Sequence, residues 1–161
     1  ALYAYKSAAD SIYRFKYRGR QEYGVYYAVC MAAQMGGWIT ACRPDALIPV
    51  PIHVSKKRVR GYNQADVLAR EIGRLMGIPI ESDLIRRVRK TAPMKDLPLA
   101  ERQNNLKRAF KICRNDVKLD TVIIIDDIYT TGSTIDAMSY ELRRAGVKRI
   151  YFAALAIGSG L

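Results

Sequence analysis

The sequence lacks the features that mark membrane proteins, disulfide scaffolds and zinc proteins. It has no run of about 18 apolar residues, so no membrane span is expected, and no signal peptide is visible. The three cysteines, Cys30, Cys42 and Cys113, are widely spaced and form no C-x-x-C pair. Buried thiols in a cytoplasmic protein are therefore predicted. The chain begins with Ala1 rather than Met, as expected of a trimmed piece of a longer protein.

No repeat, low-complexity tract or Pro/Gly/Ser-rich linker divides the chain. Half of its 161 residues are hydrophobic, which is enough for one globular domain with a real core. Histidine is nearly lacking as well, because His53 is the only one. A lone histidine is more often a surface or packing residue than a catalytic one, and we interpret His53 in that way.

Positive charge is abundant and unevenly placed. The net charge is +12, and residues 54–114 hold 16 Lys and Arg against 6 Asp and Glu. A basic middle segment suits a small polyanion or a nucleic acid, although a solvated basic face is the commoner explanation of a charge excess.

Apolar runs alternate with amphipathic stretches along the chain. This alternation predicts a parallel α/β sheet covered by helices on both faces. We expect a single domain, 1–161, with a helical cap at 1–42 and an α/β core at 43–161. Within it we expect a helix from Glu22 to about Met35 that ends at Gly36-Gly37, a strand at 46–52, a basic loop at 53–61, a helix with Ala65, Leu68, Ile72 and Leu75 inward, and a last strand at 149–157.

The stretch VIIIDDIYTTGST, residues 122–134, places two acids beside a turn that suits an anion. Its β-branched run predicts a buried strand. The hydroxyl-rich turn then opens a helix, whose N-terminus offers free N–H groups and the positive end of a dipole.

Three interpretations of this stretch compete. A Walker B strand needs a G-x-x-x-x-G-K-[ST] loop, which the sequence lacks, so it is excluded. The acids could be structural and cap the turn. Alternatively, the stretch could bind a sugar phosphate, with carboxylates on the ribose hydroxyls and the turn on the phosphate. The last interpretation explains why acids and anion donors occur together.

The same stretch resembles the 5-phosphoribosyl-1-pyrophosphate signature of type I phosphoribosyltransferases. Further similarity to the competence-associated ComF/GntX branch of that family is carried by four segments: YRFKYRGR (13–20), RVRGYNQA (58–65), RKTAP (89–93) and ERQNNLKRAF (101–110). The resemblance covers nearly the whole chain and implies the type I phosphoribosyltransferase fold.

The resemblance also implies a role for particular residues. Asp126 and Asp127 would hold the ribose hydroxyls, directly or through Mg²⁺. The 5′-phosphate would lie against Thr130, Thr131, Gly132, Ser133 and Thr134. The pyrophosphate would face Lys56, Lys57, Arg58 and Arg60. A flap within 86–107 would close over it with Arg87, Arg89 and Lys90. Many purine-using members carry Asp where this chain has Thr130, so a purine acceptor is not expected.

The resemblance implies an Mg²⁺-dependent phosphoribosyl transfer to a nitrogenous acceptor, a homodimer, and a setting of competence and DNA uptake with partner proteins of that machinery. Two alternatives remain open: a non-enzymatic DNA-uptake accessory and a single-stranded nucleic-acid-binding module. The second would use the tyrosines near the start of the chain, which lie among basic residues. We favour packing as their role and expect only weak, salt-sensitive contact with nucleic acid.

Overall fold

The computed structural model describes residues 1–89, 109–114 and 116–158. Its helices are α1 (Tyr5–Tyr17), α2 (Glu22–Cys42), α3 (Val54–Arg60), α4 (Gln64–Met76) and α6 (Ser133–Arg144). Its strands are β1 (Tyr3–Ala4), β2 (Ala46–Pro49), β3 (Ile85–Arg87), β4 (Phe110–Ile112), β5 (Thr121–Tyr129) and β6 (Arg149–Ile157). Helices and strands therefore alternate through much of the chain, as the sequence predicts.

The main sheet has the strand order β1-β6-β5-β2, and every neighbouring pair in it is parallel. A separate antiparallel pair is formed by β3 and β4. Strand β1 is short and pairs only with Ala156 and Ile157 at the end of β6. The predicted parallel α/β fold is confirmed, and the antiparallel pairing of β3 with β4 outside the main sheet is an addition to it.

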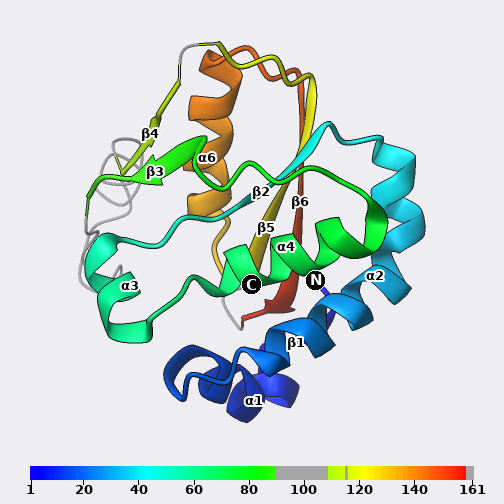
Figure 1. Cartoon of the computed structure of the whole chain (residues 1–161), viewed down its shortest axis with the longest axis vertical. Coiled ribbons are helices and arrows are strands. Elements are labelled where there is room, and N and C mark those ends of the chain that lie inside the picture. The colour runs from blue at the N-terminus through cyan, green and yellow to red at the C-terminus, as the bar shows by residue number, and fades with distance from the viewer. Residues whose placement is uncertain (90–108, 115, 159–161) are drawn as a thin grey trace.

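Strand β5 lies between two hydrophobic cores. Its side chains alternate between the faces of the sheet, as in any strand. Ile123 and Ile125 belong to the core formed with α1, α2 and α4. Val122 and Ile124 belong to the core formed with α6, β3 and β4. Figure 1 shows these two groups of elements on opposite sides of the central strands.

Helix α2 is longer than predicted. Gly36 and Gly37 do not end it, because neither has a positive φ and the helix continues to Cys42. It ends where Arg43 adopts a left-handed φ of 46°. A glycine in a helix costs only about 1 kcal/mol, and packing of α2 against α4 outweighs that cost. The helix ends at the predicted limit of the cap, although the division into cap and core stays a prediction.

The predicted basic loop at 53–61 is helix α3. His53 caps it, because the His53 Nδ1 accepts a hydrogen bond from the Ser55 N–H at 3.2 Å. Basic side chains in its last turn suit the negative end of the helix dipole, and Gly61 ends it with a φ of 83°. The preceding strand β2 stops at Pro49 rather than at residue 52. His53 thus contributes to the start of α3.

The predicted inward face of α4 is correct except at its end. Ala65, Leu68 and Ile72 are buried, and Gly77 ends the helix with a φ of 68°. Leu75 is 43% exposed instead of buried. At that end of the helix Gly73, rather than Leu75, is buried, and it packs against Ile80.

Within the described parts of the chain, none of the helices combines the length and the apolar character that crossing a membrane requires.

Candidate functional site

The acid pair lies inside β5 rather than after it. Asp126 still pairs with Ala154 of β6, and the strand continues to Tyr129. On its other side β2 ends at Pro49, which lies opposite Ile125. The acids therefore begin where the neighbouring strand stops, at the carboxyl edge where ligands bind in open parallel sheets.

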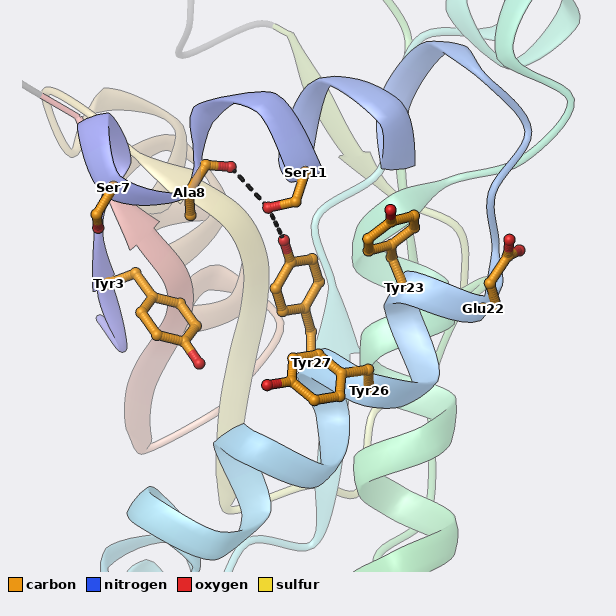
Figure 2. Close-up of a pocket in the computed structure, with 8 residues that line it drawn as sticks. All are labelled: Tyr3, Ser7, Ala8, Ser11, Glu22, Tyr23, Tyr26 and Tyr27. Atoms are coloured by element: carbon orange, nitrogen blue, oxygen red, sulfur yellow. Dashed lines mark hydrogen bonds between the residues drawn. The ribbon is translucent and has the colours of Figure 1, made fainter.

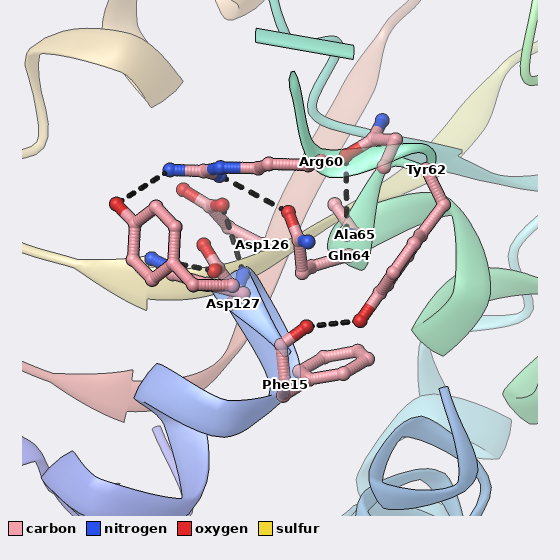
Figure 3. Close-up of polar contacts among 10 residues, drawn as sticks. Phe15, Arg60, Tyr62, Gln64, Ala65, Asp126 and Asp127 are labelled. Carbon is pink, nitrogen blue, oxygen red and sulfur yellow. Dashed lines mark hydrogen bonds and ion pairs between the residues drawn. The ribbon is translucent and has the colours of Figure 1, made fainter. Parts of the chain in front are cut away.

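Both carboxylates are partly buried and already engaged. The Asp126 Oδ1 accepts a hydrogen bond from the Asp127 N–H at 2.8 Å. Burial raises the pKa of the Asp126 carboxyl well above its usual value, and the negative charge of Asp127 raises it further. The Asp127 Oδ2 lies 2.6 Å from the Lys16 Nζ, in an ion pair whose side chains are 14% and 15% exposed. One cation thus neutralises part of the charge of this pair (Figure 3).

The predicted phosphate turn follows β5 directly. Gly132 has a φ of 77° and precedes α6, and the hydroxyls of Thr131 and Ser133 are hydrogen-bonded at 2.9 Å. The first hydrogen bond of the helix is donated by the Asp136 N–H to the Gly132 carbonyl at 2.9 Å. The N–H groups of residues 133–135 precede that bond, and in a helix such groups have no intrahelical partner. Thr130 and Thr131 are exposed, so the turn is accessible to an anion.

A side chain at Gly132 would fill this turn. A Cβ built there would lie 2.7 Å from the Tyr129 hydroxyl. The Tyr129 ring is itself held by stacking on Phe152, with ring centroids 5.0 Å apart. Tyr129 therefore lines the turn, and the sequence analysis did not identify this residue.

The basic residues of α3 are only partly directed at the acid pair. The Arg60 Nη1 donates to the Gln64 Oε1 at 3.1 Å, and its Nη2 donates to the Tyr17 hydroxyl at 3.0 Å. Lys57 and Arg58 are exposed on the same helix. Lys56 is exposed as well, but partial desolvation lowers its pKa, and the positive charges of Arg87 and Arg60 lower it further. The mutual repulsion of these cations marks a region that a polyanion would stabilise.

The predicted flap lies mostly outside the described residues. Lys90 and residues 91–107 belong to that part, so no structure is assigned to them. Arg87 lies in β3, where its guanidinium is 5.5 Å from the Phe110 ring centroid. Burial lowers the pKa of Arg87, whereas the nearby negative charge of Asp126 acts in the opposite direction. Arg89 is exposed.

Three residues of this network were missed by sequence reasoning: Lys16, Tyr17 and Gln64. Gln64 is 1% exposed and begins α4, where its Oε1 accepts from Arg60. Lys16 and Tyr17 come from the last turn of α1. All three lie in segments that carried the family resemblance, but nothing local in the sequence shows that these segments meet.

The oxygen donors fit Mg²⁺ in a limited way. Among the residues that the structure describes, no group of three or more His, Cys, Asp or Glu side chains could hold a metal ion. The two carboxylates of Asp126 and Asp127 remain. Mg²⁺ commonly binds through one or two carboxylates together with substrate phosphates, so this pair fits an ion that arrives with its ligand.

A hollow lies between α1 and α2, apart from the predicted site residues. It has a volume of about 600 Å³ and is lined mainly by tyrosines (Figure 2): Tyr3, Tyr23, Tyr26 and Tyr27 with Ser7, Ala8, Ser11 and Glu22. The Tyr27 hydroxyl donates to Ser11, which donates to the Ala8 carbonyl at 3.0 Å. None of the predicted site residues lines it.

Comparison with known proteins identifies the family. The sequence profile of the phosphoribosyl transferase domain matches residues 60–159, which include α4, the acid pair and the turn. The chain belongs to the phosphoribosyl transferase domain family. A solved purine phosphoribosyltransferase from Pyrococcus horikoshii Ot3 shares the fold, with a TM-score of 0.53 at 19% identity over 86% of this chain and 76% of that one.

Similar proteins carry the names of competence and DNA utilization proteins. Competence protein F of Haemophilus influenzae is 38% identical over 70% of this chain and 50% of its own length. DNA utilization protein YhgH of Salmonella typhi is 35% identical over 66% of this chain and 47% of its own. Competence protein ComFC of Bacillus subtilis is 27% identical over 84% of this chain and 53% of its own length. The predicted ComF-type phosphoribosyltransferase family is confirmed, and the chain spans about half the length of these relatives.

Proposed function

We propose that this domain binds 5-phosphoribosyl-1-pyrophosphate with Mg²⁺ and transfers its phosphoribosyl group to a nitrogenous acceptor. The observation that carries the proposal is the continuous unit formed by the acid pair on β5, the open turn at Gly132 and the N-terminus of α6. This unit offers acceptors for ribose hydroxyls and donors for a phosphate at a spacing of a few residues. The family match supports the same ligand class.

The chain's own residues would divide the work as follows. Asp126 and Asp127 orient the ribose, and residues 130–134 hold its 5′-phosphate. Lys56 and Arg60 face the pyrophosphate and stabilise the negative charge that develops as its bond to the anomeric carbon breaks. The same carbon then bonds to the acceptor nitrogen. Bound Mg²⁺ would supply further charge stabilisation at the pyrophosphate oxygens.

The proposal is tested by calorimetry of phosphoribosyl pyrophosphate with Mg²⁺, followed by an assay of pyrophosphate release with candidate nitrogenous acceptors. Micromolar binding with acceptor-dependent release supports transfer. Binding without pyrophosphate release in the presence of any acceptor would support the ligand site but contradict the proposed transfer. The names of the relatives support a setting of competence and DNA utilization for the proposed activity. A cytoplasmic homodimer that works with DNA-uptake proteins remains a prediction.

Lys56 gives the proposed pyrophosphate contact a pH dependence. Its lowered pKa means that the ammonium loses its proton at a lower pH than an ordinary lysine, so affinity for an anion should fall as pH rises through that value. We expect calorimetry with inorganic pyrophosphate between about pH 7.5 and pH 10 to show this fall. The Lys56→Arg variant keeps its charge and should show a smaller fall. Identical profiles for the two proteins would remove Lys56 from the contact.

A second candidate function, binding of single-stranded nucleic acid, has one observation in its favour. Tyr13, Tyr17 and Tyr26 are 54%, 53% and 61% exposed, and the Tyr13 and Tyr17 rings lie 5.0 Å apart. Arg14 and Arg18 lie beside them on α1 and its cap and line a polar hollow with Tyr13. Such a surface could stack bases and contact phosphates.

A salt titration of single-stranded DNA binding separates the two candidates. If the positive charge serves pyrophosphate, DNA binding should be weak, fall steeply with salt and be displaced by phosphoribosyl pyrophosphate with Mg²⁺. If the tyrosines stack bases, Tyr13→Ala and Tyr26→Ala should each cost about 1–3 kcal/mol even at high salt. We expect the first result. Tight binding that persists at physiological salt and ignores the small ligand would favour the nucleic-acid module.

A further inference from the structure

Three consecutive residues in the last turn of α1 contact the surroundings of the acid pair, and one of them, Lys16, contacts the pair itself. The Phe15 carbonyl accepts a hydrogen bond from the Tyr62 hydroxyl. Lys16 forms the 2.6 Å ion pair with Asp127. The Tyr17 hydroxyl accepts from Arg60, whose guanidinium carbon also lies 4.9 Å from the centre of the Tyr17 ring. Figure 3 shows Phe15 and Tyr62 in one view with Arg60, Asp126 and Asp127.

The Lys16 contact competes with a ligand. An ammonium 2.6 Å from the Asp127 Oδ2 occupies the position from which a divalent cation or a ribose hydroxyl would approach that oxygen. Both side chains are largely buried, so water screens the ion pair weakly and a second cation beside Lys16 would be repelled. The ammonium must leave before a ligand can take its position at this oxygen.

The Tyr17 contact acts on the anion side of the same site. It holds one edge of the Arg60 guanidinium while Gln64 holds another. The two N–H groups of Arg60 that donate to Tyr17 and Gln64 are not directed at a pyrophosphate. Asp127 and Arg60 thus each have a partner within the chain, and the last turn of α1 supplies one partner of each.

The release of these contacts needs little movement of the helix. Ile12 and Phe15 are fully buried and anchor α1 in the core. Tyr17 is 53% exposed, and Gly19 just after the helix has a φ of 63° with open space around it. The Lys16 and Tyr17 side chains can therefore swing out when the last turn of α1 loosens at Gly19, while the rest of the helix stays in place.

We propose that Lys16 and Tyr17 form an internal cover of the ligand site, which phosphoribosyl pyrophosphate with Mg²⁺ displaces when it binds. The inference rests on the proposed function, because it concerns the ligand of the same site. The internal cover couples the helical cap to the ligand site. Ligand binding frees the end of α1, and anything that holds the end of α1 in place lowers the affinity for the ligand.

The experiment compares the affinity for phosphoribosyl pyrophosphate with Mg²⁺ in the wild type and in Lys16→Met, Lys16→Arg and Lys6→Met. Methionine keeps the length and the apolar stem of lysine without its charge. Lys16→Met should bind about tenfold more tightly, which corresponds to loss of a weak internal competitor. Lys16→Arg keeps a cation and should resemble the wild type. Lys6→Met, an exposed site on the same helix, should also resemble it.

Stability is followed by thermal melting, because Lys16→Met leaves Asp127 without its cation. If that variant does not fold, Lys16→Gln replaces it, since the amide can still donate to Asp127. Equal or weaker binding by the folded neutral variant overturns the cover and leaves the proposed function intact. Absence of binding in every protein overturns both.

A second readout uses the wild type alone. Hydrogen exchange at the amides of residues 15–17 should become faster when the ligand binds, since the end of the helix is released. Slower or unchanged exchange in the ligand complex contradicts the cover, whatever the variants show.

Discussion

Replacement of Asp126 and Asp127 together by Asn is expected to reduce the affinity for phosphoribosyl pyrophosphate with Mg²⁺ by about a hundredfold or more. Each carboxylate would lose a charged hydrogen bond worth about 1.5–3 kcal/mol, which is roughly tenfold or more per residue. Calorimetry on the double variant measures the loss. Unchanged affinity would exclude the acid pair as the ribose site.

The two acids should differ in their effect on stability. The raised pKa of Asp126 shows that its surroundings favour a neutral group, so Asp126→Asn should cost little folding free energy. Asp127→Asn leaves Lys16 largely buried without a charged partner and should lower the melting temperature. Asp120→Asn is a matched control. It lies at the other end of β5 and forms an exposed ion pair with Lys148 at 3.0 Å, so both affinity and stability should change little.

Gly132→Val is expected to abolish the binding of ribose 5-phosphate. The new side chain would be strained at a φ of 77°, and its Cβ would lie where the Tyr129 hydroxyl crowds the turn. The backbone N–H groups at the start of α6 would then no longer surround a phosphate. Titration calorimetry with ribose 5-phosphate measures the loss, and circular dichroism shows whether the fold is kept.

The control for strain lies at the other end of the same helix. Gly146 has a φ of 100°, and a Cβ there would meet nothing within 4 Å. Gly146→Val therefore imposes a similar backbone strain far from the turn. It should lower the melting temperature and leave ribose 5-phosphate binding unchanged. Loss of binding in both variants would attribute the effect to destabilisation of α6 rather than to the phosphate turn.

Local patterns were predictable from the sequence, and contacts between distant segments were not. The apolar run before Asp126 predicts a buried strand because its side chains must fill both faces of the sheet, and the structure confirms it. Gly132 was predicted to lie in a tight turn for an equally local reason. The true end of β5 was missed, since pairing with β6 carries it on to Tyr129.

Other errors have the same origin. Gly36 and Gly37 have poor intrinsic helix preference, but α2 continues through them because it packs against α4. The Lys16–Asp127 ion pair joins the first helix to the fifth strand, and no periodicity in either segment indicates it. Acid pair and turn could be predicted, whereas the cation that accompanies them required the tertiary structure.

The position of β5 between two cores has a consequence for cooperativity. Ile123 and Ile125 complete one core and Val122 and Ile124 the other, so neither layer keeps its packing when the strand is lost. The layers should therefore melt together as one unit. A ligand held at the end of this strand is linked to both, and its binding free energy adds to the stability of the whole fold rather than of one face.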